Sequence, residues 1–103
     1  MTDRVAFRLR ISPDKMAEYV TAHAAVWPEM LDALRAAGYR NYTIFRSDND
    51  VFGYYECDDV VATADYMAAQ EVNTRWGKEI NPLLAERVDG ATPPPLETVF
   101  RLD

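Results

Sequence analysis

The stretch YRNYTIFRSDNDVFGYYEC, residues 39–57, decides the fold of this 103-residue chain. Residues 39–46 and 51–57 are rich in aromatic and β-branched side chains, which favour extended strands. Between them, Ser47-Asp48-Asn49-Asp50 has the composition of a tight turn. The stretch therefore predicts a β-hairpin in the middle of the chain.

A helical pattern precedes this hairpin. It runs over residues 14–37, with Ser12 as a start signal and Gly38 as a stop signal in the left-handed position that ends many helices. Pro28 lies inside this pattern and removes a backbone N–H donor. We therefore expect the helical segment to break or kink near residues 26–27.

A second helical region follows the hairpin. Asp58 and Asp59 begin it, because acidic side chains are favourable at the positive end of a helix dipole. The first helix is expected to end near residue 69, and a further helical segment covers residues 72–84. Residues 88–95 are rich in proline and are expected to be irregular.

The two ends of the chain supply the remaining strands. Residues 5–11 alternate strictly between apolar and polar side chains, and residues 96–102 form a fourth strand. The resulting order is the α+β split βαβ, or ferredoxin-like, arrangement with helices on one face of a four-stranded sheet. We expect residues 1–103 to be a single domain that forms a homodimer sheet to sheet, since dimerisation covers the open sheet face.

The composition excludes several classes of partner. The chain has a net charge of −6 and no basic stripe, which argues against nucleic acid and against anionic membrane surfaces. No apolar run approaches the roughly 18–20 residues that span a bilayer. The single cysteine, Cys57, suits a reducing compartment and predicts a cytoplasmic protein. Histidine, cysteine and carboxylates lack metal-ligand spacing, so we expect no metal.

A stripe on the first helical pattern carries candidate chemistry. Tyr19, His23 and Trp27 are spaced at i, i+4 and i+8, which predicts one shared helix face. Such a stripe is either core packing or part of a site, and spacing alone leaves both open. His23 is the only histidine, and its ordinary pKa of roughly 6.5 suits proton transfer near neutrality. Glu29 is either a proton-transfer group or a first-turn acid of a helix that begins at Pro28.

Further aromatic side chains with polar groups suit a sugar ligand or a dimer interface equally well. A sugar presents C–H faces that stack on aromatic rings and hydroxyls that form hydrogen bonds. The sequence contains no nucleophile elbow and no glycine-rich phosphate loop. These aromatic residues are Tyr39, Tyr42, Tyr54, Tyr55, Tyr66 and Trp76.

Several motifs resemble those of the L-rhamnose mutarotase family. The sequence HAAVWPE at residues 23–29, preceded by Tyr19, resembles the helix signature of that family. NYTI at residues 41–44, Arg-Trp at residues 75–76 and LETVF at residues 96–100 are similar to three further elements of the family. The resemblance covers nearly the whole chain.

This resemblance implies a homodimeric α/β barrel, in which two ferredoxin-like sheets face each other. It implies an aldose 1-epimerase that interconverts α and β anomers of L-rhamnose or a related monosaccharide without a cofactor. By the same resemblance, His23 is the catalytic proton donor, and Tyr19, Tyr42 and Trp76 bind the sugar. Gly77 departs from the family pattern, because a second tryptophan is common at that position. Residues 86–95 also differ from the usual family segment, so the departures concern the sugar pocket more than the fold.

Alternative functions exist on the same dimeric barrel. A cofactor-free oxygenase, a haem-handling protein and a non-catalytic small-ligand binder all fit the fold. Haem use would need an axial ligand, for which the chain offers His23 or Cys57. Mutarotation, in contrast, needs only one group that donates a proton and one that accepts it.

Overall fold

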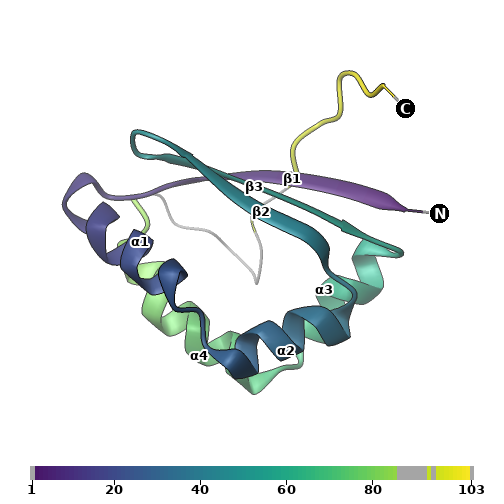
Figure 1. The fold of residues 1–103 in the computed structure, drawn as a ribbon, viewed down its shortest axis with the longest axis horizontal. Coiled ribbons are helices and arrows are strands. Elements are labelled where there is room, and N and C mark those ends of the chain that lie inside the picture. The colour runs from purple at the N-terminus through teal and green to yellow at the C-terminus, as the bar shows by residue number, and fades with distance from the viewer. Residues whose placement is uncertain (1, 86–92, 94, 103) are drawn as a thin grey trace.

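The computed structural model describes residues 2–85, 93 and 95–102. Within these residues, a three-stranded antiparallel sheet lies beside four α-helices, which confirms the predicted α+β class. Figure 1 shows all four helices on the same side of the sheet. The elements in chain order are β1 (Asp3–Arg10), α1 (Met16–Ala24), α2 (Pro28–Ala37), β2 (Arg40–Ser47), β3 (Asp50–Cys57), α3 (Val60–Ala68) and α4 (Glu71–Ile80).

The predicted hairpin is confirmed, and its second strand, β3, is the central strand of the sheet. Strand β3 pairs with both β1 and β2, so the strand order is β1-β3-β2. Ser47 pairs with Asp50 at the end of the hairpin, and Asp48 adopts a φ of +51° in the turn between them. Asparagine and aspartate tolerate this left-handed conformation better than most residues. The Nε of Arg46 donates a hydrogen bond of 2.9 Å to the Asp48 carbonyl oxygen.

The first helical region is divided where the sequence predicts. Helix α1 ends at Ala24, and α2 begins with Pro28 at its first position, where no hydrogen-bonded N–H is needed. Gly38 ends α2 with a φ of +101°, which an L side chain rarely adopts. The sequence spacing predicts one helix face for Tyr19, His23 and Trp27, and this prediction is wrong for Trp27. Trp27 is the N-cap of α2 and lies beyond the end of α1, which carries Tyr19 and His23.

The second helical region is also confirmed as two segments. The carboxylate of Asp59 caps α3 by accepting hydrogen bonds from the backbone N–H groups of Val61 and Ala62, at 3.0 and 3.1 Å. Helix α4 is followed by a short 3₁₀ turn, Asn81–Leu83. An isolated antiparallel β-bridge between Ile11 and Leu84 joins the residue after this turn to the residue after β1.

The prediction of a fourth strand over residues 96–102 is wrong for this structure. The N–H of Leu96 donates a hydrogen bond of 2.7 Å to the carbonyl oxygen of Ala6 in β1, but the described residues 96–102 do not form a strand. Beyond it the segment leaves the sheet on the side opposite the helices (Figure 1). Val99 and Phe100 are 91% and 81% exposed, so the segment finds no apolar surface in its own chain to hold it as a strand. Most of the predicted irregular stretch, residues 88–95, lies outside the described residues.

Figure 1 shows the helices close to the sheet at α1 and at α3 and farther from it at α2 and α4, and the core is divided accordingly. One buried cluster surrounds Ile11 and Val51 near α1, a second surrounds Met67 between the helices, and a third surrounds Tyr55 on the sheet. Side chains of the three clusters form the walls of an internal space. Within the described residues, no helix is long and apolar enough to cross a membrane.

Candidate active site

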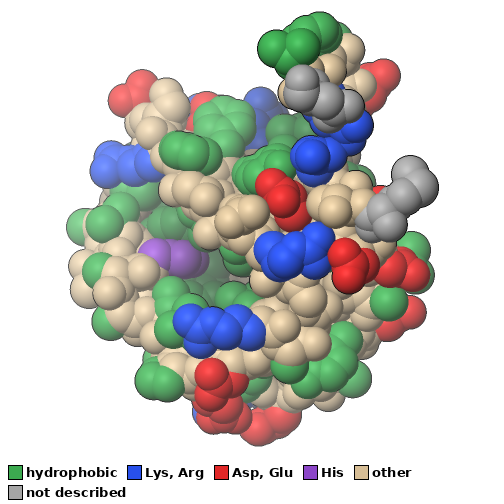
Figure 2. All heavy atoms as spheres, turned by 45° about the vertical axis from the view of Figure 1, so that its right-hand side comes forward, with side chains coloured by type: hydrophobic (Ala, Val, Ile, Leu, Met, Phe, Trp, Pro, Cys, Tyr) green, Lys and Arg blue, Asp and Glu red, His purple; other side chains and the backbone are tan. Residues whose placement is uncertain are grey.

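A cavity of about 1490 Å³ lies between the inner face of the sheet and the helices. Figure 2 shows the histidine at the edge of a hollow in the surface. The four residues that the resemblance assigns to the site, Tyr19, His23, Tyr42 and Trp76, all line this cavity. They come from α1, β2 and α4, so residues far apart in the sequence meet here.

His23 is held by the helix turn that precedes it. Its Nδ1 lies 2.8 Å from the carbonyl oxygen of Tyr19. A carbonyl oxygen only accepts hydrogen bonds, so Nδ1 carries the proton and donates it. In the neutral ring, Nε2 is then the nitrogen with a lone pair. The Tyr19 ring stacks on the imidazole with ring centroids 4.1 Å apart, which fixes its plane.

The electrostatics of the site favour neutral side chains. Burial lowers the pKa of His23 below its ordinary value, and the hydrogen bond to Tyr19 offsets this only in part. The imidazole is therefore mainly neutral at pH 7. Burial raises the pKa of Tyr19 to about 12, so this phenol keeps its proton. Both side chains are therefore uncharged in the resting site.

Trp76 forms the wall beside His23. Its indole meets the imidazole edge to face, with ring centroids 5.5 Å apart. The rings of Trp27 and Trp76 also meet edge to face, with their centroids 5.0 Å apart. Trp27 is not among the residues that line the cavity. Trp27 therefore supports the wall from behind and does not contact a ligand in the cavity.

Glu29 belongs to an ion-pair network outside the cavity. The terminal guanidinium nitrogen Nη2 of Arg75 donates a hydrogen bond of 2.9 Å to the Glu29 carboxylate. The Nε of Arg75 lies 2.9 Å from the carboxylate of Glu71. The Arg75 guanidinium also lies 5.8 Å from the centroid of the Trp27 ring. Glu29 is an exposed first-turn acid of α2 that is joined to α4. Of the two sequence-based interpretations, the geometry supports the structural one.

A β-bulge places Tyr42 in the site. The β2–β3 register shifts between Arg40 and Thr43, and Asn41 adopts a φ of +52° there. In a regular strand, residues 39 and 42 would point to opposite faces. The bulge removes this alternation, and both Tyr39 and Tyr42 line the cavity. The signal for the bulge is the asparagine, a residue type enriched in the left-handed region.

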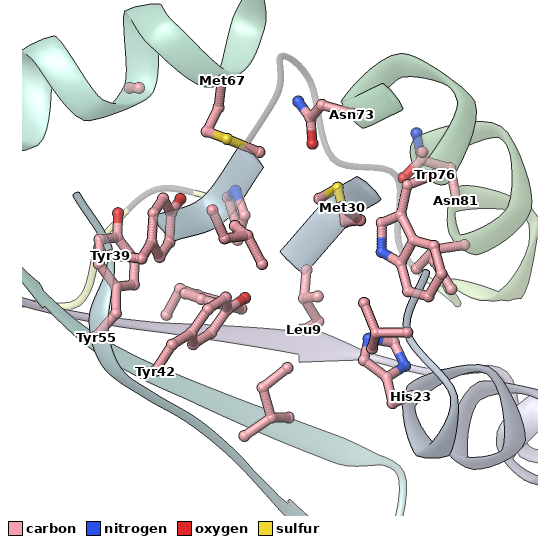
Figure 3. Close-up of a pocket in the computed structure, with 18 of the residues that line it drawn as sticks. Leu9, His23, Met30, Tyr39, Tyr42, Tyr55, Met67, Asn73, Trp76 and Asn81 are labelled. Atoms are coloured by element: carbon pink, nitrogen blue, oxygen red, sulfur yellow. The ribbon is translucent and has the colours of Figure 1, made fainter. Parts of the chain in front are cut away.

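Sequence reasoning assigned Tyr42 to the sugar site by resemblance, but it left Tyr39 and Tyr55 open between a sugar ligand and an interface and did not name Asn73 and Asn81. Tyr39, Tyr42 and Tyr55 pack together at the end of the cavity opposite His23, and we call them the tyrosine cluster (Figure 3). Their ring centroids lie 4.3 to 5.6 Å apart. Asn73 and Asn81 add amide groups on the helix side. The other tyrosines considered from the sequence, Tyr54 and Tyr66, are not in the cavity lining.

The cavity floor depends on a glycine. Phe7 of β1 pairs with Gly53 of β3, and the Phe7 ring lies directly over the Gly53 backbone. A methyl group at Gly53 would overlap this ring. Glycine thus permits the close approach of an aromatic ring that lines the cavity.

Cofactor ligands are scarce in the described part of the chain. It contains no group of three or more histidine, cysteine or acidic side chains that could hold a metal ion. Cys57 is fully buried in the core cluster of Phe7 and Tyr55 and does not line the cavity. Of the two axial ligands considered for haem, only His23 reaches this space.

The family model and the related sequences that match this chain carry the same description. A family model described as L-rhamnose mutarotase matches residues 4–102. The L-rhamnose mutarotase of Oceanobacillus iheyensis is 34% identical, and the match covers 97% of this chain and 98% of the relative. The L-rhamnose mutarotase of Burkholderia orbicola is 37% identical, with 98% and 99% covered.

Solved structures show the same fold. The crystal structure of an L-rhamnose mutarotase from Formosa agariphila has a TM-score of 0.79 and 23% identity, covering 98% of this chain and 99% of that one. Tetracenomycin F2 cyclase from Streptomyces glaucescens has a TM-score of 0.70 and 16% identity, covering 98% and 97%. These similarities confirm the predicted ferredoxin-like α+β fold, despite the strand missing from the sheet.

Proposed function

The chain belongs to the L-rhamnose mutarotase family, and on that premise we propose that it interconverts the α and β anomers of L-rhamnose. The observation that carries this proposal is the arrangement of His23 and Tyr19. A neutral imidazole with Nδ1 fixed by a carbonyl lies in a cavity walled by aromatic rings. This geometry supplies proton transfer and sugar stacking in one place. The chain therefore acts as an aldose 1-epimerase.

The reaction moves one proton from oxygen to oxygen. The anomeric hydroxyl loses its proton, the bond between the anomeric carbon and the ring oxygen breaks, and the ring oxygen gains a proton. The resulting aldehyde rotates about its bond to the next carbon. Reclosure from the other face reverses each step and gives the opposite anomer. Atoms and electrons balance without a redox partner or a covalent bond to the protein.

His23 is the proton-transfer residue in this proposal. Because its pKa is lowered, the imidazole arrives neutral and Nε2 first accepts a proton from the anomeric hydroxyl. The imidazolium then acts as the donor when the ring closes again. A neutral tyrosine hydroxyl, from Tyr19 or Tyr42, or a water is the counterpart that protonates the ring oxygen. Tyr42 and Trp76 supply hydrogen bonding and an apolar face for the sugar.

Optical rotation tests this proposal directly. Crystalline α-L-rhamnose is dissolved, and the change of optical rotation is followed with and without the protein. We expect the approach to equilibrium to accelerate in proportion to protein concentration, since positioned acid–base groups contribute roughly 10²–10⁴-fold. An unchanged rate would contradict the proposed mutarotase activity. None of the relatives described above is named as an oxygenase.

We also propose that the active form is a homodimer. On the outer face of the sheet, Phe45 and Phe52 pair across β2 and β3, with exposed fractions of 61% and 38%. The terminal segment adds apolar side chains on the same side of the sheet, among them Val99 and Phe100 (Figure 1). Burying these surfaces against a second copy, sheet to sheet, would remove about 25 cal/mol of unfavourable hydration per Å².

Light scattering decides the oligomeric state. We expect a mass about twice the 11.7 kDa of one chain at micromolar concentration. Phe45→Ser should shift the protein toward monomer. Val61→Ser, at an exposed site on α3, is the matched control and should leave the mass unchanged. A wild-type mass of one chain would contradict the dimer.

We propose a cytoplasmic location for the enzyme. The single cysteine, Cys57, is buried and free, which suits a reducing compartment. Separation of cell fractions followed by immunodetection checks this, and recovery from the membrane fraction would contradict it.

A further inference from the structure

The cavity is larger than the proposed substrate requires. A hexose occupies about 200 Å³ at the packing density of organic crystals, whereas the cavity measures about 1490 Å³. Pockets for drug-sized ligands typically hold roughly 300–1,000 Å³. A sugar placed against His23 and Trp76 therefore leaves most of the space unfilled. Figure 3 shows this space continuing past Leu9 and Met30 to the tyrosine cluster.

The tyrosine cluster has the chemistry of a binding surface for a neutral ring. Burial raises the pKa of Tyr39, Tyr42 and Tyr55, so the phenols remain protonated. Tyr39 and Tyr55 share a side-chain hydrogen bond, which leaves their remaining hydrogen-bonding capacity and the Tyr42 hydroxyl for a ligand, and each ring offers an apolar face. In Figure 3 the Tyr42 hydroxyl points toward the space between the two ends of the cavity.

Charge in the lining does not favour an ionic group at this end. The described lining contains no carboxylate, and its cationic side chains are Arg35 and Lys78, since His23 is mainly neutral. Both lie at exposed positions, and Arg35 is already 3.6 Å from Asp32. A neutral ligand rich in hydroxyls and C–H groups therefore fits the cluster better than a phosphorylated sugar does.

We propose that the Tyr39 and Tyr55 end of the tyrosine cluster is a second subsite, which binds a second sugar ring linked to the reducing sugar through a hydroxyl other than the anomeric one. Tyr42 lies between the two ends and contacts the reducing ring. This inference rests on the proposed function, since the reducing ring lies against His23. The anomeric hydroxyl must stay free for ring opening, and the glycosidic bond between the two rings remains intact. Reducing disaccharides are then substrates as well as free L-rhamnose.

Substitutions in the cluster can separate the two ends of the cavity. Tyr39→Phe removes one hydroxyl, and Ala64→Phe on α3 fills space on the helix side of the cavity. The ring contacts of Tyr39 are to Tyr42 and Tyr55, and Tyr39→Phe keeps this ring while it removes the hydroxyl. Tyr66→Phe makes the same change as Tyr39→Phe at a tyrosine that is not in this cavity lining, and serves as the matched control.

The experiment compares L-rhamnose with a disaccharide that carries a second hexose on O4 of a reducing L-rhamnose. Exchange NMR measures anomer interconversion of both sugars. For the disaccharide, we expect kcat/KM to fall about two- to tenfold in Tyr39→Phe, the worth of one hydrogen bond, and at least tenfold in Ala64→Phe. The rate for L-rhamnose should stay within twofold in both variants. Equal losses for the two sugars would overturn the subsite.

Saturation transfer provides a readout that is independent of catalysis. In the wild type and in Tyr66→Phe, we expect protons of the second ring to receive saturation from the protein, and in Ala64→Phe to lose most of it. Saturation confined to the reducing ring would overturn the subsite even if the enzyme is active. If the protein accelerates neither sugar, the proposed function fails, and the saturation pattern still decides whether the second ring is bound.

Discussion

The Nδ1 of His23 donates a hydrogen bond of 2.8 Å to the carbonyl oxygen of Tyr19, one helical turn earlier on the same helix. The Tyr19 ring lies against the imidazole at 4.1 Å between centroids. These two contacts fix both the tautomer and the plane of the ring. They explain how a chain with a single histidine can present one defined nitrogen, Nε2, to a substrate.

Replacement of this histidine tests its role. We expect His23→Asn to lower the catalysed rate of anomer exchange by at least tenfold, because His23 is the single histidine of the chain and lines the cavity. Thermal unfolding measured in parallel separates chemistry from stability. A well-folded variant with undiminished activity would exclude His23 as the proton-transfer residue.

The pH profile follows from the direction of the His23 pKa. Burial lowers it below about 6.5, and the neutral imidazole is the form that accepts the anomeric proton. Activity should therefore be constant near pH 7 and decline as the pH falls below about 6. Stability should change with the same sign, because the unfolded chain binds this proton more readily than the folded one does. Rates measured from pH 5 to 8 check this, and a profile that rises toward low pH would contradict it.

Gly77 gives the clearest specificity prediction. A Cβ at this position would meet only the Asn81 amide nitrogen, at 3.5 Å, so a side chain has room to begin here. Gly77→Trp should restore the ring that the family pattern has, and an aromatic face contributes roughly 1–2 kcal/mol to sugar binding. We expect L-rhamnose to bind about five- to thirtyfold more tightly and the range of accepted aldoses to narrow.

Gly77→Ala is the control for that substitution. It adds one carbon and should leave sugar affinity unchanged, while α4 gains about 0.5–1 kcal/mol of stability. Titration calorimetry with a panel of aldoses measures both variants. If Gly77→Trp gains nothing and the glycine protein already discriminates sharply, position 77 does not shape the pocket.

The contact between Phe7 and Gly53 can be tested by a double-mutant cycle. Gly53→Ala forces the Phe7 ring away from β3 and should destabilise the protein by about 1–3 kcal/mol, the usual cost of overpacking. Phe7→Leu offers a smaller side chain and should recover part of this loss when combined with Gly53→Ala. Denaturant unfolding of the four proteins measures the coupling. Strictly additive effects would mean that the two residues do not constrain each other.

Local signals in the sequence predict much of this fold. Backbone angles are restricted locally at Pro28, at Gly38 and in the turn before Asp50. Helix α2 begins at Pro28 and ends before Gly38, and β3 begins at Asp50. Whether residues 96–102 form a strand depends on a surface for pairing and packing, and in this structure Val99 and Phe100 are exposed. Local alternation cannot reveal such a dependence, because it describes one segment and not its partner.

The site was predictable to a smaller extent. The spacing of Tyr19 and His23 places them one helical turn apart, and the structure stacks them. Tyr39 lies on the same side as Tyr42 only because the bulge at Asn41 interrupts the alternation of β2. The position of Trp76 relative to His23 follows from the packing of α4 near α1, which no local pattern encodes.

Exchange NMR of L-rhamnose at anomeric equilibrium tests the central claim most directly. Magnetisation transfer between the α and β anomeric protons is measured in buffer, with the wild-type protein, and with His23→Asn at equal concentration. We expect strong transfer with the wild-type protein and transfer close to the buffer value with His23→Asn. Transfer at the buffer value with the folded wild-type protein would contradict the proposed mutarotase activity.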